Sequence, residues 1–594
     1  MDIKSLFSSS INITKIFNRK ESFNFYILLL MMLIGAALET LSVGLIFPIL
    51  SIIVNPTESS KLDSLSIFFD ISIISGDTIT VVIYGVIIFF SVYVFKNIFL
   101  SYLFWRQSKF IYNLMASTAE KLFKGYIYKP YIFHIQINSA ELIRNLTTEM
   151  NLFNGSIKAL TTLFTELLVL VGIASLLLFL QPMVSFVVGI FLLLATAVFY
   201  LLTKNRIKKW GEERQFHERY RIQHLQQSIG GNKEIKILEN EREFINQFKK
   251  HNSEWGNIGQ RQNFIEAIPR LWLEIVAIGL LSILIILLIS TGNSLSEIIP
   301  IIGMFGAAAF RLLPSINRTI GALQRLIYTL PVVNIISNEL RDILVDDNII
   351  PHQEIKKRKT LNKKQFKTWR KVKIENICYK YPNSNEMILK NLNLTFNRGQ
   401  SIGIIGRSGE GKSTFVDVLL KLLPAESGKI FLDNSEVDND ILSWRSEIGY
   451  VPQQIYLIDD SLKKNIALGL REEDIDQEKL INAIKLSQLD KFVSSLPNNI
   501  DTKVGERGVQ ISGGQSQRIG IARALYNDPS IILFDEATSS LDSSTENEVM
   551  RSIDSLKGDK SLILITHRTS TLKNCDTIYK LQHGSLIEVS YESV

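Results

Sequence analysis

The residues Gly406-Arg407-Ser408-Gly409-Glu410-Gly411-Lys412-Ser413 decide the fold of the second half of this chain, and they fit the pattern G-x-x-x-x-G-K-[ST]. The apolar run Ser401–Ile405 before them predicts a buried strand, and Thr414–Leu423 after them predicts a helix. Glycines let the backbone wrap closely around an anion, and the N–H groups at a helix N-terminus attract negative charge. A strand, a glycine loop and a helix in this order therefore predict a phosphate-binding loop.

Two side chains at the end of the loop give it a specific chemistry. Lys412 is placed to reach the β and γ oxygens of a nucleotide, and the hydroxyl of Ser413 is placed to bind Mg²⁺. The alternative is an ordinary glycine turn between a strand and a helix. Because the lysine and serine are both in register and the flanking elements are correct, the pattern favours the phosphate loop.

Hydrophobic residues make up 46% of the 594 residues and are unevenly distributed. Long apolar runs fill the part before about residue 345, whereas the part after it alternates short apolar strands with charged helical segments. This predicts a membrane domain followed by a soluble α/β domain. The two cysteines, Cys378 and Cys575, lack C-x-x-C spacing, which excludes a thiolate metal site and suits a reducing compartment.

Six apolar segments reach the length of about 20 residues that a membrane-spanning helix needs. They are Phe25–Val54, Ile79–Trp105, Leu160–Leu180, Met183–Leu202, Phe264–Ser290 and Ile298–Leu323. The first segment is too long for the core of a signal peptide, so we interpret it as a retained span. The residues Met1–Glu21 before it mix Lys and Arg with Ile and Phe, as a segment lying on an anionic membrane surface does.

The distribution of lysine and arginine predicts the orientation. The segments Arg106–Lys158 and Lys204–Arg261 are rich in both, whereas Pro56–Asp77 has only Lys61. The positive-inside rule then places both basic segments, the N-terminus and the C-terminal half in the cytoplasm. These segments are long and show helical patterns, so we expect the helices to continue well beyond the membrane.

A basic segment separates the two halves and contains the run Lys356–Lys359. Such a run could bind nucleic acid, but directly after a membrane span it more often meets anionic lipid headgroups, so no nucleic-acid partner is expected. The predicted domains are 1–345 for the membrane domain, 346–371 for the basic linker and 372–594 for the soluble domain.

The soluble half holds further residues suited to nucleotide chemistry. Tyr381 can stack on a base, and Gln453 follows an apolar strand with an amide that can serve a metal or a water. Ser512–Gln515 opens a predicted helix over Gln517–Tyr526 and presents N–H groups to an anion.

Two acids and a histidine complete this set. Asp535 and Glu536 end a buried strand, where the first is placed to hold Mg²⁺ and the second to orient or deprotonate an attacking water. His567 ends the strand Ser561–Thr566 within reach of a γ-phosphate. Taken singly, Tyr381 and His567 would more often be structural residues, and it is their combination that favours a catalytic site.

The whole set resembles the ATP-binding cassette family over residues of about 372 to 587. The resemblance implies that Tyr381 is the A-loop aromatic, Gly406–Ser413 with the adjacent Thr414 the Walker A loop, Gln453 the Q-loop glutamine, Ser512, Gly513, Gly514 and Gln515 the signature, Asp535 and Glu536 the Walker B pair, Asp542 the D-loop acid and His567 the switch histidine. It implies ATP and Mg²⁺ as cofactors, with Ser413, Gln453 and Asp535 at the metal. Ile511 and Ser516 depart from the common signature, but neither change removes a catalytic group, so a hydrolytic site is expected.

Six spans and one cassette resemble the half-size exporters, which work as homodimers with ATP held between one copy's Walker A loop and the other's signature. Segments around Lys129–Tyr131, Asn138–Arg144 and Gly230–Ile235 resemble the coupling regions that dock on the nucleotide domain, and Thr502–Gly508 resembles the segment that senses them. The alternative for all of them is an ordinary solvated loop.

The transported substrate must be inferred from ionisable residues inside the spans, which are costly there unless they face a partner or a wet cavity. These residues are Glu39, Lys96, Glu166, Arg270, Glu274, Arg311 and Arg318. One interpretation is pairing between helices. The other is that Arg270, Arg311 and Arg318 bind a phosphate or pyrophosphate headgroup.

Around Gly35–Thr40, Ala267–Glu274 and Phe310–Arg318 the chain resembles bacterial flippases for lipid-linked oligosaccharides. This favours flipping of a polyprenyl-pyrophosphate glycan across the inner membrane, with membrane lipid and a second copy of the chain as partners. Export of other lipids, peptides or small amphiphiles is the second hypothesis, and a non-transporting regulatory ATPase is the third.

Overall fold

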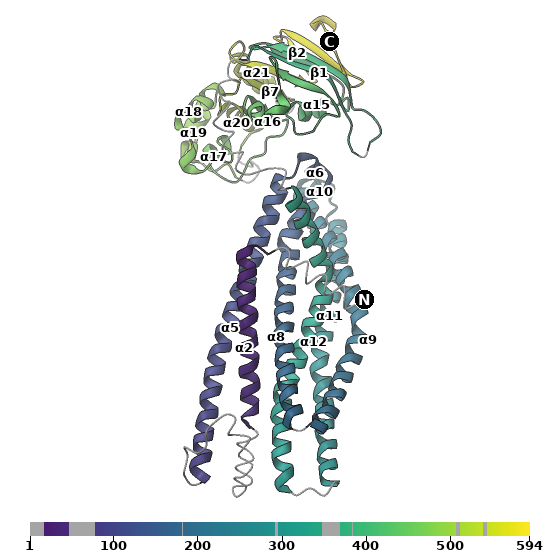
Figure 1. Cartoon of the computed structure of the whole chain (residues 1–594). Coiled ribbons are helices and arrows are strands. Elements are labelled where there is room, and N and C mark those ends of the chain that lie inside the picture. The colour runs from purple at the N-terminus through teal and green to yellow at the C-terminus, as the bar shows by residue number, and fades with distance from the viewer. Residues whose placement is uncertain are drawn as a thin grey trace. The chain divides into compact units, whose positions relative to one another are not determined.

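The computed structural model describes residues 17–46, 78–180, 182–290, 295–346, 369–382, 384–505, 511–537 and 543–593. The chain divides into two compact units, one of Met1–Lys129 with His134–Ile349 and one of Pro130–Phe133 with Ile350–Val594. The first unit is helical, whereas the second combines sheets with helices (Figure 1).

Six long helices form the first unit, and each contains described residues of one predicted span. They are α2 (Arg19–Gly44), α5 (Thr78–Tyr128), α8 (Met150–Leu180), α9 (Pro182–Gly230), α11 (Glu241–Ser290) and α12 (Leu295–Asp346). The described residues also include the shorter segments α6 (Tyr131–Gln136), α7 (Ser139–Arg144), the π-helical turn η3 (Asn145–Glu149) and α10 (Asn232–Leu238), and the start of α6 belongs to the second unit.

The long helices extend beyond a membrane, as the basic segments predict. The 51 residues of α5 correspond to about 76 Å at 1.5 Å per residue, which is more than twice the ~30 Å of the hydrocarbon core. Arg106 therefore lies within a continuous helix and not at the start of a loop.

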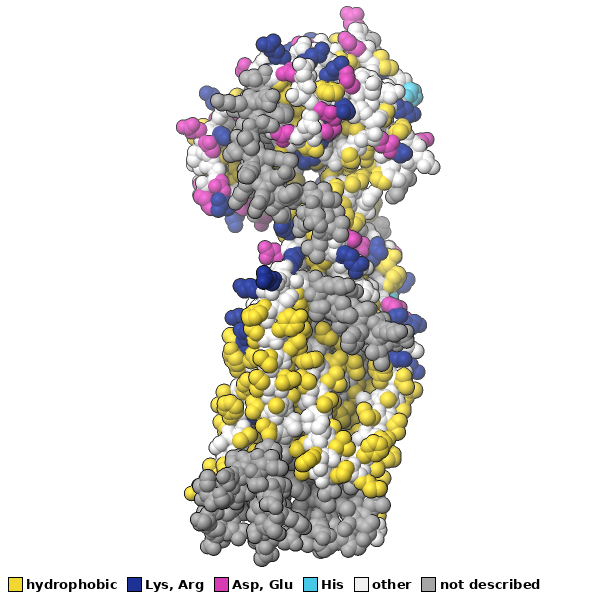
Figure 2. Space-filling model, in the orientation of Figure 1, with side chains coloured by type: hydrophobic (Ala, Val, Ile, Leu, Met, Phe, Trp, Pro, Cys, Tyr) yellow, Lys and Arg dark blue, Asp and Glu magenta, His cyan; other side chains and the backbone are white. Residues whose placement is uncertain are grey.

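Apolar side chains cover the outside of these helices. Phe104, Phe186 and Leu193 each expose 60% or more of their surface, and Figure 2 shows a band of such side chains, with Lys and Arg gathered beyond one end of it. Lipid covers a surface of this kind. Among the described residues, five helical segments are long and apolar enough to cross a membrane, namely 19–44, 83–128, 139–180, 185–230 and 308–343. The predicted span Phe264–Ser290, in α11, is not among these five.

Small residues allow close helix packing in this unit. Ala36 of α2 and Ala308 of α12 join Val169 and Ile173 of α8 in one buried cluster. Gly211 of α9 lies against the backbone of α12, where an added Cβ would lie 2.3 Å from the carbonyl oxygen of Tyr328.

Two sheets organise the second unit. The first is antiparallel in the order β2-β1-β4-β5, with β1 Lys371–Tyr379, β2 Leu389–Asn397, β4 Ser427–Leu432 and β5 Ser435–Glu436. The second has the order β10-β9-β3-β8-β7-β6, with β3 Ser401–Ile405, β6 Ile448–Val451, β7 Ile531–Asp535, β8 Ser561–Thr566, β9 Thr577–Gln582 and β10 Ser585–Val589. In this second sheet only the pair of β9 and β10 is antiparallel.

Both faces of the second sheet are buried. Leu533 of β7 belongs to one hydrophobic core, and its neighbours Ile532 and Phe534 belong to another, because successive side chains of a strand point to opposite faces. The α-helices of this unit are α15 (Lys412–Leu419), α16 (Ile441–Ser446), α17 (Leu462–Ile466), α18 (Gln477–Leu486), α19 (Asp490–Ser495), α20 (Gly513–Leu525) and α21 (Ser543–Asp554).

The predicted fold class is confirmed, with a helical membrane domain followed by an α/β P-loop domain. The predicted strand Ser401–Ile405 is β3. Two predicted helix boundaries were wrong. The helix after the loop spans Lys412–Leu419, not Thr414–Leu423, since Gly411 adopts a left-handed backbone directly before it. The helix after the signature starts at Gly513, not at Gln517, because Ser512 caps it.

We predict that Gly211→Ala destabilises the helical unit by about 1–3 kcal/mol, since the methyl group would meet a backbone oxygen that cannot move aside. The measurement is the apparent melting temperature of the purified protein in detergent. Gly189→Ala makes the same change on the same helix, where an added Cβ meets nothing within 4 Å, and serves as the control. Equal melting temperatures for the two variants would contradict the close approach of α9 and α12.

Candidate nucleotide-binding site

The glycine loop joins β3 to α15 at the carboxyl edge of the parallel sheet. Gly409 and Gly411 have φ angles of 85° and 97°, a left-handed conformation that glycine adopts without strain. An added Cβ on Gly406 would lie 2.9 Å from the carbonyl oxygen of Leu581. The loop therefore depends on its glycines for both conformation and space, as the sequence pattern predicts.

Lys412 lies folded over the loop and is almost fully buried. Its ammonium group donates to the carbonyl oxygens of Gly406, at 2.9 Å, and of Arg407, at 3.3 Å. The same nitrogen lies 3.4 Å from a carboxylate oxygen of Glu536 and 2.7 Å from Nε2 of His567. Three side chains predicted from separate motifs thus form one cluster.

Parallel strands bring the cluster together. Asp535 of β7 pairs with Ile565 of β8, so the residues that follow the two strands meet at the same edge. Nε2 of His567 lies 2.7 Å from Oε1 of Glu536. A neutral imidazole uses Nε2 either to accept from Lys412 or to donate to Glu536, so the tautomer decides which contact is a hydrogen bond.

Glu536 has strained backbone geometry. Its φ of 50° is in the left-handed region, which is uncommon for a residue other than glycine, and its N–H donates to the carbonyl oxygen of Ile565 at 2.8 Å. Its other carboxylate oxygen, Oε2, accepts from Nε2 of Gln453 at 3.0 Å. Gln453 is held in turn by Gln517 of α20, whose Nε2 donates to its carbonyl oxygen at 3.0 Å.

Acidic groups crowd the edge next to this cluster. Burial, and then the charge of Glu536, raise the pKa of Asp535. Burial, and then the charge of Asp535, raise the pKa of Asp417 to about 6. The hydroxyl of Tyr450 donates to Asp535 at 3.3 Å. A bound cation would relieve this repulsion between carboxylates.

These residues suit Mg²⁺. Ser413 lies in the first turn of α15 beside the loop, Gln453 follows β6, and Asp535 is the last residue of the adjacent parallel strand β7. Within the described ranges, no group of three His, Cys, Asp or Glu side chains could hold a metal by itself. Mg²⁺ usually takes one or two protein ligands and completes its shell with phosphate oxygens and waters, so a site shared with a nucleotide fits this donor set.

Tyr381 lies against the helix that follows the loop. Its hydroxyl is 3.1 Å from Oγ1 of Thr414, and its ring meets that of Tyr379 edge to face with centroids 5.2 Å apart. Part of the ring remains exposed, so it can stack on a base. The structure therefore brings the predicted aromatic to the loop.

The signature segment caps the helix that it starts. Ser512 and Gln515 form a reciprocal capping box at the start of α20, with the Ser512 N–H donating to Oε1 of Gln515 at 3.0 Å. In the described part of the chain, this segment makes no hydrogen bond or ion pair with Lys412, Glu536 or His567. Asp542 and part of Thr502–Gly508 lie outside the described residues, as does most of the basic linker.

Sequence reasoning missed two residues of the site, Asp417 and Tyr450. Asp417 is four residues after Ser413 on α15, so helical spacing places both on one face and was an available signal. Tyr450 lies on β6, which pairs with β7, but its role depends on the pairing of strands that are distant in sequence.

The arginines predicted to bind substrate are paired with carboxylates. Arg311 binds both oxygens of Glu39, from Nε at 2.9 Å and Nη2 at 2.8 Å, and Lys96 lies 3.4 Å from the same carboxylate. Arg318 binds both oxygens of Glu166. Arg270 is exposed and meets Glu274 one turn along α11 at 3.3 Å. This is the pairing between helices that the sequence left as the first interpretation for Arg311 and Arg318.

Two family models match the chain. Residues 41–310 match the ABC transporter transmembrane region, and residues 389–539 match the ABC transporter ATP-binding model. The second match contains the glycine loop, Gln453, the signature and both Walker B acids.

Known proteins agree with these matches. The chain is 42% identical over 219 residues to the ATP-dependent lipid A-core flippase of Pseudoalteromonas translucida, an alignment that covers 36% of this chain and 38% of that protein. It is 27% identical over 481 residues to the flippase of the same name from Alkalilimnicola ehrlichii, covering 80% and 79% of the two chains. A solved structure of a bacterial Atm1-family ABC exporter with ATP bound is similar in fold, with a TM-score of 0.74 at 20% identity over 96% of each chain.

One family accounts for three findings. They are the apolar surface of the helical unit, the phosphate loop with its Lys412–Glu536–His567 cluster, and the two family matches. The chain belongs to the ABC transporters, as a half-transporter with one transmembrane region and one ATP-binding domain.

Proposed function

We propose that this chain hydrolyses ATP to move an amphiphilic substrate across the bacterial inner membrane, with polyprenyl-pyrophosphate oligosaccharides as the substrate class. The observation that carries the hydrolytic part is the cluster of Lys412, Glu536 and His567 at one edge of the sheet. Export of other lipids, peptides or small amphiphiles is the alternative. An inactive regulatory ATPase is disfavoured because a base, a cation and a histidine lie in contact.

Each residue has a proposed role in this reaction. Lys412 binds the β and γ oxygens, and the loop N–H groups hold the β-phosphate. Glu536 accepts the proton of the attacking water, and Gln453, which contacts it, orients that water. His567 positions the γ-phosphate. Mg²⁺, held by Ser413, Gln453 and Asp535, would neutralise the charge that develops on the phosphate oxygens.

A second copy of the chain completes the proposed site. Ser512–Gln515 presents a helix N-terminus suited to an anion, yet within the described residues no hydrogen bond or ion pair joins it to Lys412, Glu536 or His567 of its own chain. A homodimer that places each signature against the other copy's loop would use both elements and form two equivalent sites. In this arrangement the N-terminus and the nucleotide domain are cytoplasmic, as the basic segments indicate.

The substrate class rests on charge within the helical unit and on relatives named for flipping lipid A-core. Arg318 keeps 44% of its side chain exposed while it binds Glu166, whereas Arg311 keeps 23%. A guanidinium that is paired on one edge can still donate from the other edge to a phosphate oxygen. We therefore retain both arginines as proposed contacts for a diphosphate.

We predict that Glu536→Gln lowers kcat for ATP hydrolysis by about 10²–10⁴-fold, because it removes the base, while ATP still binds. The measurement combines steady-state hydrolysis in reconstituted vesicles with equilibrium ATP binding. Glu478→Gln, an exposed change on α18, controls for the loss of one negative charge. Hydrolysis by Glu536→Gln at the rate of the control would overturn the catalytic assignment.

We predict that Lys412→Ala weakens ATP binding roughly 10–100-fold, since it deletes charge-assisted hydrogen bonds to the phosphates. Binding is measured by titration with a fluorescent ATP analogue. Lys429→Ala removes an exposed lysine from the same domain, where it pairs with Glu436, and should leave the affinity within about twofold. Equal affinities for the two variants would contradict the phosphate role of Lys412.

We predict that Arg318→Gln impairs translocation of a lipid-linked oligosaccharide in vesicles, and that Arg318→Lys impairs it less, because lysine keeps the charge but loses the bidentate geometry. The same order is expected for Arg311. Removing an arginine also strands a buried carboxylate, which by itself costs stability. Translocation must therefore be compared with the yield of stable dimer.

The double variant Arg318→Gln/Glu166→Gln separates these effects, since it removes both charges of the pair. We expect it to restore assembly but not translocation. Full translocation by this variant would show that Arg318 serves only as the partner of Glu166. The pair Arg311→Gln/Glu39→Gln provides the same comparison for the other arginine.

A further inference from the structure

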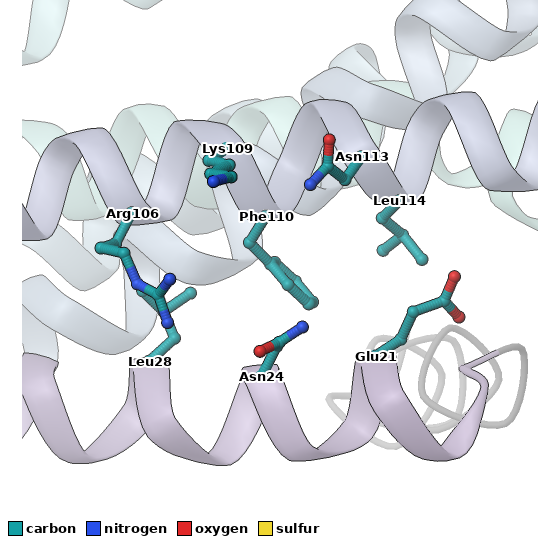
Figure 3. A pocket seen from close by; sticks show the side chains of 8 residues that line it. All are labelled: Glu21, Asn24, Leu28, Arg106, Lys109, Phe110, Asn113 and Leu114. Carbon is teal, nitrogen blue, oxygen red and sulfur yellow. The ribbon is translucent and has the colours of Figure 1, made fainter.

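A pocket with a partly polar lining opens between α2 and α5 in the helical unit. Its polar lining comes from Glu21 and Asn24 on α2 and from Arg106, Lys109 and Asn113 on α5, and Phe110 forms part of its wall. Figure 3 shows Arg106 and Phe110 extending from α5 toward α2, and Asn24 and Glu21 extending from α2 toward α5. The pocket volume is about 100 Å³, well above the ~10–15 Å³ that one water needs.

The pocket lies where two predicted spans meet the membrane surface. The first span starts at Phe25, next to Asn24, and the second ends at Trp105, next to Arg106. Trp105 and Tyr102 are both more than half exposed and stack with centroids 5.8 Å apart. Exposed Trp and Tyr side chains mark the headgroup level of a bilayer. The exposed rings of Trp105 and Tyr102 therefore also place the pocket at the headgroup level.

The pocket carries excess positive charge. Within the described residues, neither Arg106 nor Lys109 forms an ion pair, although Lys109 lies over the ring of Trp105 at 5.0 Å. Glu21 is already engaged, because Oε2 accepts from the N–H of Asn18 at 2.6 Å and lies 3.6 Å from Lys121. Among the lining residues, Arg106 and Lys109 against Glu21 leave a net charge of +1.

We propose that this pocket binds the phosphate of an anionic phospholipid in the cytoplasmic leaflet, the side that the basic segments indicate. Arg106 supplies a planar guanidinium and Lys109 an ammonium group, and the amides of Asn24 and Asn113 supply further donors. Phe110 offers an apolar wall to the start of the acyl chains. A basic pocket between helices on the cytoplasmic side of a membrane is suited to such headgroups. The inference rests on the proposed topology and not on the transported substrate.

The test measures lipid binding without ATP or any transported substrate, so its failure and the failure of the proposed function are distinguishable. The purified full chain is mixed with equal amounts of phosphatidylglycerol and phosphatidylcholine in detergent, and bound lipid is counted by native mass spectrometry. We expect wild type to retain phosphatidylglycerol preferentially. Arg106→Gln/Lys109→Gln should weaken this binding at least roughly tenfold.

Three further arms make the outcome specific. Lys208→Gln/Lys209→Gln removes the same charge from exposed, paired positions on α9 near the same predicted membrane face, and we expect a change below about threefold. Lys109→Gln alone alters an exposed residue, so it keeps the test valid if the double variant fails to fold. Inorganic phosphate is added at about 10 mM, a concentration that nearly saturates a site that binds phosphate with millimolar affinity. It should not displace the lipid.

Three results would overturn the proposal. The first is equal retention of the two lipids by wild type. The second is an equal loss of binding in the pocket and control variants. The third is displacement by inorganic phosphate, which would instead indicate a site for the free anion.

Discussion

Three buried glutamates in the described part of the helical unit each bind an arginine of another helical segment. Glu39, Glu149 and Glu166 expose 7% or less of their surface. Arg311 of α12 binds Glu39 of α2, Arg214 of α9 binds Glu149 of η3, and Arg318 of α12 binds Glu166 of α8. A buried charge without a partner costs several kcal/mol, so a shift of one helix by a single turn would be strongly unfavourable. These pairs therefore determine how α2, α8, α9 and α12 align along one another. Apolar contacts with lipid do not favour one alignment over another.

The nucleotide site also contains a buried charge that needs a partner, but here the buried charge is positive. Lys412 is the buried cation there, and its charge is balanced by Glu536 and by the carbonyl oxygens of Gly406 and Arg407. The left-handed backbone of Glu536 aims its carboxylate at this cation, and the hydrogen bond from its N–H to Ile565 of the next strand holds that conformation. A ligand that brings its own negative charge to Lys412 would compete with Glu536 for the ammonium group and so leave the carboxylate available for a proton. In the proposed mechanism, binding and catalysis would therefore be coupled through one lysine.

Sequence predicted the parts of this protein that local chemistry determines. The glycine loop and the buried strand before it depend on residue types at fixed spacing and lie where the pattern placed them, and the described part of each predicted span lies in a long helix. The predicted start of α20 at Gln517 was wrong. Ser512 and Gln515 cap each other and start the helix earlier, and both residues are visible in the sequence. The contacts of Lys412 with Glu536 and His567, and the choice of Glu39 and Glu166 as partners for the arginines, depend on residues more than 100 positions apart. A single sequence carries no direct signal for such pairing.

The two ion pairs of α12 differ in what they still offer an anion. Glu166 and Arg318 neutralise each other, so the pair has no net charge. Arg318 nevertheless keeps almost half of its side chain exposed and is accessible to an anion. Glu39 is shared by Arg311 and Lys96, which leaves a net charge of +1, but Arg311 is more enclosed and Lys96 is buried. In each pair the arginine uses Nε and Nη2 on its carboxylate, so only the Nη1 edge remains for a further acceptor. In the proposed function, a phosphate of the substrate would therefore meet an accessible donor at Arg318 and surplus positive charge at Arg311 and Lys96.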